Sequence, residues 1–131
     1  MSKLPDQWKA TLKKPVFIHL STVMPDGSPQ TSPVWVDIED DTIVVNSAQG
    51  RLKDKNMRRD PRVAISVTDP DNPYAALNVR GKVTEITTKD ADAHIDSMAK
   101  KYLGKDKYPF ARPGEQRVIY RITPEKVSSM G

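Results

Sequence analysis

The chain of 131 residues is expected to form one domain, residues 1–131, because folded domains most often hold roughly 100 to 150 residues. Hydrophobic residues make up 37% and charged residues 29%, which is a globular composition, and the formal net charge is +4. The sequence has no cysteine, which excludes disulfides, zinc knuckles, iron–sulfur clusters and thiol nucleophiles.

The first element in chain order is a short helix over residues 5–14, in which Leu4, Trp8 and Leu12 recur every four residues. A strand over 16–23 then leads through a glycine-containing turn into a second strand over 30–38, so that the two form a hairpin. Pro33 has no N–H to donate to a ladder, and it therefore predicts a bulge or an edge in the second strand.

Further along, a strand over 42–46 is followed by a basic helix, which Pro61 stops. Gly81 is expected to bend a long later strand, Asp90 to cap the helix after it, and Gly104 to end that helix. The remaining strands are expected over 62–68, 74–88 and 117–123, with 124–127 as a short addition. About six strands and three short helices predict a mainly β fold, a closed or nearly closed antiparallel barrel.

The most informative segment runs from the strand end Asn46-Ser47 through Gly50 into the basic helix. Five basic side chains fall within nine positions, namely Arg51, Lys53, Lys55, Arg58 and Arg59. A helix start offers backbone N–H groups and a positive dipole end, and cationic side chains in the first turn can converge on the same anion. The segment therefore predicts a phosphate-binding corner, although a solvated basic face or nucleic-acid binding would produce a similar run.

Other candidate sites are weaker. His19 and His94 are the only histidines, and neither has a carboxylate or a second ligand at metal spacing, so both are expected to be structural and no metal site is predicted. The acidic side chains of Asp37, Glu39 and their neighbours are explained by a turn. The nucleophile elbow, the P-loop and the glycine-rich dinucleotide fingerprint are all missing from the sequence.

A strand interrupted by proline lies ahead of the basic corner. It carries small hydroxyls and a tryptophan in the run Gln30-Thr31-Ser32-Pro33-Val34-Trp35-Val36. Such a strand can belong to the core, or it can lay its backbone against a planar ring. Together with the basic corner, it suggests a flat heteroaromatic cofactor with a phosphorylated tail.

Three segments then resemble a known family. They are the run from Asp26 to Trp35, the run from Gly50 to Val63 and the run from Asp69 to Tyr74, and Tyr102-Leu103-Gly104 with the later Pro113-Gly114-Glu115 extends the pattern. The chain resembles the pyridoxamine 5′-phosphate oxidase-like superfamily, and within it the branch of deazaflavin (coenzyme F420)-dependent reductases. The resemblance implies a six-stranded antiparallel split β-barrel, known as the FMN-binding split barrel.

The same resemblance implies a homodimer with cofactor sites at the subunit interface. Arg51 and Lys53 would hold phosphate, helped by Asn46, Ser47 and Lys55. Other residues would line the ring, namely Gln30, Ser32, Pro33, Val34 and Trp35, while Tyr74, Leu77 and Tyr108 would serve the substrate side or the partner subunit's site.

The implied activity is hydride transfer from reduced F420 to an electron-poor acceptor such as an activated alkene, a quinone or a tetrapyrrole. No catalytic side chain is evident. FMN is the alternative cofactor, because its phosphate would fit the same corner, and a non-catalytic protein that sequesters a cofactor or tetrapyrrole is a further alternative. The chain has neither a signal-peptide run nor about 20 consecutive apolar residues, so a cytoplasmic location is expected.

Overall fold

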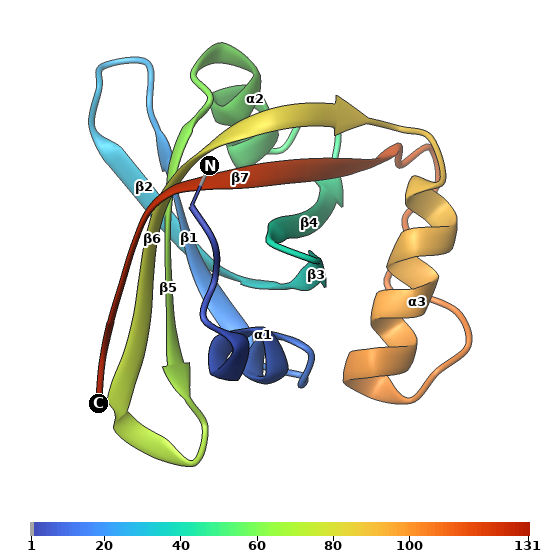
Figure 1. The fold of residues 1–131 in the computed structure, drawn as a ribbon. Coiled ribbons are helices and arrows are strands. Elements are labelled where there is room, and N and C mark those ends of the chain that lie inside the picture. Colours follow the sequence, from blue (N-terminus) through green and yellow to red (C-terminus); the bar gives the residue numbers. More distant parts are fainter. Residues whose placement is uncertain (1) are drawn as a thin grey trace.

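Strand-forming and helix-forming segments alternate along the chain and assemble into one curled sheet with three helices (Figure 1). The structure is a computed structural model and describes residues 2–131. The helices are α1 (Asp6–Leu12), α2 (Leu52–Arg59) and α3 (Ala91–Leu103). The strands are β1 (Phe17–Val23), β2 (Pro29–Trp35), β3 (Asp37–Glu39), β4 (Thr42–Ala48), β5 (Arg62–Asp69), β6 (Asn72–Thr87) and β7 (Arg117–Met130).

All neighbouring strands are antiparallel, in the order β2-β1-β5-β6-β7-β4-β3. The long strands β6 and β7 curve together across the molecule and carry the sheet round into a half-barrel (Figure 1). The predicted bend at Gly81 is confirmed, because the register with β7 shifts between Arg80 and Gly81. A Cβ atom at Gly81 would lie only 2.6 Å from the carbonyl oxygen of Thr123, so the close approach of the two strands requires glycine here.

The sheet has seven strands in the described part of the chain, where six were predicted. The segment expected as one strand over 30–38 divides at Val36, which is fully buried. Its N–H donates to the hydroxyl of Tyr102 at 2.9 Å instead of to a neighbouring strand. As a result β2 pairs with β1 at one edge of the sheet and β3 pairs with β4 at the other.

Two further expectations have clear outcomes. Pro33 lies on β2, which is an edge strand, as its missing N–H predicted. Asp90 precedes α3 in the left-handed conformation, with φ of 61°, and its side chain makes no capping hydrogen bond, so the expected cap is wrong.

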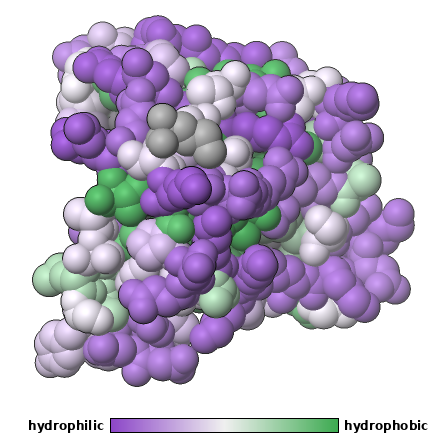
Figure 2. Space-filling view, viewed as in Figure 1, coloured by the Kyte–Doolittle hydropathy of each residue, from purple (hydrophilic) through white to green (hydrophobic). Residues whose placement is uncertain are grey.

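Alternation along the strands separates two apolar layers. Val45 and Tyr120 face the main core inside the curl, where Trp8 and Leu12 of α1 pack, while Val44 and Ile119 face α3 on the other side. Figure 2 shows that the surface in this view is largely hydrophilic, with apolar side chains gathered in small patches. Within residues 2–131, no helix is long and apolar enough to cross a membrane.

Candidate functional site

A cleft of about 220 Å³ opens where the end of β4 and the start of α2 meet the edge strand β2, α3 and the segment before β7. One end is cationic and hydroxylic, and the other is aromatic and apolar. Its lining residues are Phe17, Pro33, Val34, Trp35, Asn46, Ser47, Arg51, Lys53, Ile95, Met98, Tyr108, Phe110 and Arg117.

Three cations converge at the polar end. Arg51 precedes α2, Lys53 lies in its first turn, and Arg117 begins β7. Burial lowers the pKa of Lys53, and the positive charges of Arg51 and Arg117 lower it further. The structure thus holds like charges together, an arrangement that a bound anion would stabilise.

Glu115 balances only part of this charge. Its carboxylate lies 3.1 Å from Nη2 of Arg51 and 3.3 Å from Nη1 of Arg117, and its side chain is largely buried. Three cations and one carboxylate leave two positive charges at this end of the cleft. The hydroxyl Oγ of Ser47 is buried there without a hydrogen-bond partner among the described residues, whereas Nη1 of Arg117 and Oε2 of Glu115 have only their mutual ion pair. A buried hydroxyl without a partner beside excess positive charge is a feature that a phosphate group would satisfy.

Arg117 was missed by the sequence reasoning. It is 5% exposed, and the pairing of β4 with β7 sets it opposite Ala48, next to the strand end that carries Asn46 and Ser47. Its Nε donates to Oδ1 of Asn46 at 2.9 Å, and its guanidinium lies over the ring of Tyr108 at 5.0 Å. Only the strand register brings it to the corner, because 66 residues separate it from Arg51 and no local motif marks it.

A buried carboxylate fixes the turn that carries Arg51. Asp54 is 2% exposed and accepts hydrogen bonds from the Gly50 N–H and from Nε of Arg58, each at 2.9 Å, and from the hydroxyl of Tyr120. Burial opposes ionisation of Asp54, but these hydrogen bonds outweigh it and hold its pKa below the ordinary value. The backbone between β4 and α2 is therefore anchored from the core side.

Stacked aromatic rings form the other end of the cleft. Trp35 is parallel to Tyr102, with ring centroids 4.7 Å apart and an interplanar angle of 8°. Tyr108 meets Trp35 edge-on at 6.1 Å, and Phe110 meets Tyr108 edge-on at 5.6 Å. Such a wall suits one edge or face of a planar ring system.

Most of the predicted residues meet in this cleft, namely Pro33, Val34, Trp35, Asn46, Ser47, Arg51, Lys53 and Tyr108. The others do not line it, for reasons that the fold supplies. Lys55 is two residues from Lys53 and thus on another side of α2, where it is exposed. Gln30 accepts a hydrogen bond from Thr22, and Ser32 is paired with the core residue Leu20 of β1.

Tyr74 and Leu77 lie on β6, away from the cleft. The side chain of Leu77 is fully buried in the hydrophobic core and is presented to no cleft. Tyr74 is 82% exposed near the start of β6. A role for Tyr74 in a partner subunit's site stays a prediction.

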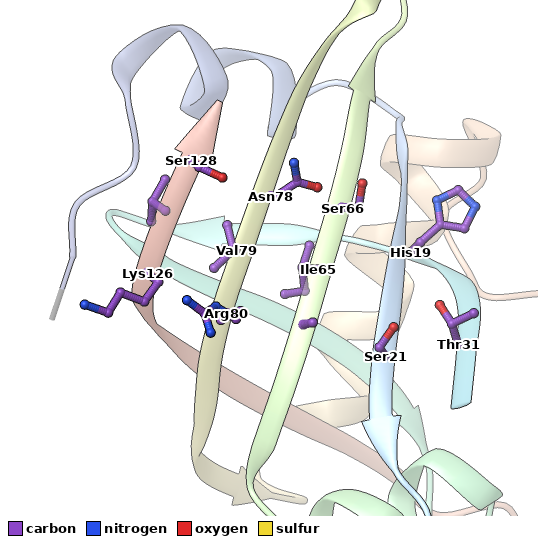
Figure 3. A pocket seen from close by; sticks show the side chains of 12 residues that line it. His19, Ser21, Thr31, Ile65, Ser66, Asn78, Val79, Arg80, Lys126 and Ser128 are labelled. Atoms are coloured by element: carbon purple, nitrogen blue, oxygen red, sulfur yellow. The ribbon is translucent and has the colours of Figure 1, made fainter. Parts of the chain in front are cut away.

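A second hollow, of about 560 Å³, crosses β1, β5, β6 and β7 (Figure 3). His19, Ser66, Asn78 and Ser128 lie directly opposite one another on these four strands and form one polar row. In the next row Arg80 is opposite Lys126, and no carboxylate pairs with either cation among the described residues. This broad, open face is lined by the polar side chains of both rows together with aliphatic residues such as Ile65, Val79 and Val127.

Comparisons with known proteins identify the fold and the family. Among solved structures, one named F420 Reductase is 33% identical, with a TM-score of 0.83, and the match covers 95% of this chain and 98% of that chain. Two others share the fold: a conserved hypothetical protein from Mycobacterium tuberculosis (21% identity, TM-score 0.73, 98% of this chain and 89% of that chain) and HupZ of Group A Streptococcus (19%, 0.69, 97% and 94%). No curated protein matches the sequence.

The family model described as pyridoxamine 5′-phosphate oxidase matches residues 4–131, which is nearly the whole sequence. The curled antiparallel sheet with its three helices has the architecture of the split barrel. The chain belongs to the pyridoxamine 5′-phosphate oxidase-like split-barrel family.

Proposed function

We propose that this protein is an F420-dependent reductase that passes a hydride to an electron-poor small molecule, such as an activated alkene, a quinone or a tetrapyrrole. One observation carries the proposal: a partly neutralised cluster of three cations, beside the buried and unpartnered hydroxyl of Ser47, stands at one end of a cleft whose other end is aromatic. The 33% identity to a structure named F420 Reductase supports this choice of cofactor.

Each end of the cleft has its own task in this proposal. The guanidinium groups of Arg51 and Arg117 can each donate two parallel hydrogen bonds to phosphate oxygens, while the Lys53 ammonium acts as a point charge. The hydroxyl of Ser47 supplies a further donor. Trp35, held flat by Tyr102, offers a wall against which a planar ring can be oriented.

When bound, the reduced deazaflavin supplies the hydride, so the protein has only to bind, orient and shield it. The titratable side chains that line the cleft are Arg51, Lys53, Tyr108 and Arg117. No carboxylic acid or histidine is among them, so we assign no general acid and expect solvent to supply the proton that the product needs.

A second copy of the chain is part of the proposal. The cleft of about 220 Å³ is smaller than the roughly 300 to 1,000 Å³ of typical small-molecule sites, so one subunit encloses only part of a tricyclic cofactor with a tail. The small polar row across β1, β5, β6 and β7 offers a broad face for the partner (Figure 3). A homodimer would complete the cleft at the subunit interface.

FMN binding is the second candidate function, and the charge of the corner favours it. The two uncompensated positive charges match a phosphomonoester dianion such as the phosphate of FMN. The chain would then be an FMN-dependent oxidoreductase, or a flavin-binding protein without turnover.

The test is a titration of purified Trp8→Phe protein with F420 and, separately, with FMN, following the fluorescence of Trp35. Trp8 is buried in the core, so its replacement leaves one emitter beside the cleft. Tight F420 binding with weak FMN binding, followed by oxidation of reduced F420 by an added quinone or alkene, supports the reductase. A preference for FMN moves the protein to the second candidate, and binding of neither contradicts both.

A further inference from the structure

The side-chain amide of Asn46 has no hydrogen-bond donor left for a phosphate. Its Nδ2 donates to the carbonyl oxygen of Ala91 at 3.0 Å and lies 3.0 Å from Nδ1 of His94. Its Oδ1 accepts from Nε of Arg117 at 2.9 Å. An amide nitrogen has two hydrogens, and both are committed. Turning the amide over would set its oxygen against the Ala91 carbonyl and its nitrogen against the Arg117 N–H, so the hydrogen bonds fix its orientation.

This orientation also fixes the tautomer of His94. Because Asn46 donates to Nδ1, the proton of the neutral imidazole must be on Nε2, which lies 2.9 Å from Oδ2 of Asp37. Burial opposes ionisation of Asp37, but hydrogen bonds from His94 and from the Ile38 N–H hold its pKa below the ordinary value. The carboxylate of Asp37 therefore stays ionised and accepts a hydrogen bond from the Nε2–H group of His94.

A continuous chain of hydrogen bonds thus runs from Asp37 through His94 and Asn46 to Arg117. The four residues come from β3, α3, β4 and β7, and they end at the guanidinium in the cationic corner. We propose that Asn46 is a positioning residue for the anion site: it holds Arg117 toward the cleft, with His94 and Asp37 fixing Asn46 in turn, and does not itself contact the phosphate.

The charges around Arg117 explain why its guanidinium needs a hydrogen bond that fixes its position. Lys53 and Arg51 repel it, while Glu115 and the ring of Tyr108 attract it from other sides. An anchor at Nε leaves Nη2, and the N–H of Nη1 that is not directed at Glu115, to donate to an incoming anion. The inference rests on the proposed anion site and names the residue that orients it.

The test compares the dissociation constants of FMN and riboflavin, which differ only by the phosphate. Their ratio measures what the corner contributes, independently of any activity. Asn46→Ala is expected to weaken FMN binding about tenfold and to leave riboflavin binding unchanged, since an orienting hydrogen bond to a charged group is lost. Gln49→Ala, at an exposed amide beside the corner, is the matched control and should change neither constant.

A double-mutant cycle separates positioning from direct contact. In an Arg117→Met background, Asn46→Ala should cost no further FMN affinity, because nothing remains for Asn46 to orient. The same tenfold loss in this background would show that Asn46 contacts the phosphate itself and would overturn the inference. Equal FMN and riboflavin affinities in the wild type would instead contradict the anion site of the proposed function.

Nitrogen-15 NMR of the imidazole gives a second readout on protein that need not bind anything. The wild type is expected to show His94 with its proton on Nε2. Asn46→Ala should shift the Nδ1 resonance, because Nδ1 loses its hydrogen-bond donor while Asp37 still holds the proton on Nε2, whereas Arg117→Lys should leave the Nδ1 resonance unchanged. An Nδ1 resonance that does not respond to loss of Asn46 would contradict the proposed chain of hydrogen bonds.

Discussion

At the scale of single residues, the buried carboxylate of Asp54 stabilises the turn that carries the cationic site. Asp54→Asn should lower the free energy of unfolding at pH 7 by about 1 to 3 kcal/mol, because the Gly50 N–H and the Tyr120 hydroxyl lose a charged acceptor. The depressed pKa of Asp54 means that its stabilisation exists above the unfolded-state pKa near 4 and is lost as pH falls through the folded-state value. Urea unfolding should therefore show the gap between wild type and variant narrowing in acid. A gap of constant size would contradict this account, and Asp106→Asn, an exposed acid, serves as the control for the change in charge.

Lys53 differs from Asp54, because its charge is expected to favour anion binding and to destabilise the ligand-free protein. Its pKa is lowered by burial and by two neighbouring cations, so the free protein carries a repulsion that an anion would relieve. Lys53→Met should raise the Tm of the ligand-free protein by about 1 to 4 °C and weaken FMN binding roughly 10-fold or more, with riboflavin binding unchanged. Lys55→Met, in the same turn but exposed, should alter none of these. Thermal unfolding with and without FMN would measure both effects, and a lower Tm of the ligand-free Lys53→Met variant would contradict the prediction.

At the scale of elements, α3 supports the aromatic half of the cleft through two consecutive residues. Lys101 donates to the carbonyl oxygens of Leu12 and Val36 at 2.8 and 2.6 Å. Tyr102 donates to Val16 and accepts from the Val36 N–H, and burial raises its pKa to about 12, so the phenol stays protonated at neutral pH. Tyr102→Phe should cost about 1 to 3 kcal/mol of stability, because the buried Val36 N–H loses its partner, yet keep the ring stacked on Trp35. Tyr102→Leu should in addition weaken riboflavin and FMN binding equally. Unfolding curves and near-UV circular dichroism would separate the two effects, and a loss confined to FMN would contradict the division of the cleft.

Elements predicted from residues close together in the sequence were predicted correctly, whereas features set by distant residues were not. The hairpin, the basic helix and the Gly104 end of α3 rest on residues a few positions apart, and the structure has all three. The division at Val36 could not be foreseen, because alternation continues across it and the cause is a hydroxyl 66 residues away. The continuity of β7 could not be foreseen either. Pro124 was expected to end the strand over 117–123, but it lies opposite Gly81 at the register shift, where the hydrogen-bond ladder is already irregular.

For the whole molecule, the fold class was predictable and the complete site was not. Local patterns supplied Arg51, Lys53, the strand that carries Trp35 and an antiparallel barrel, and the resemblance made this barrel the split barrel. Arg117 and Glu115 come to the corner only through the pairing of β4 with β7, a long-range contact that leaves no trace in nearby sequence. Leu77 was predicted to serve the substrate side or the partner subunit's site, but it is buried in the core. The pairing of β6 within the sheet, which is also a long-range feature, decides which of its side chains face inward.

The last prediction concerns the proposed homodimer, since the cleft of one subunit is too small to enclose a tricyclic cofactor alone. Sedimentation analysis should find a dimer at micromolar concentration. Ser66→Arg puts a long cation into the polar row on β5, in the hollow that Arg80 and Lys126 also line, and should produce monomers that also bind F420 and FMN more weakly (Figure 3). Thr88→Arg, at an exposed position beyond the end of β6, adds the same charge and should change neither property. A wild-type monomer that binds cofactor tightly would contradict the shared cleft, and a Ser66→Arg monomer with full affinity would show that each subunit binds alone.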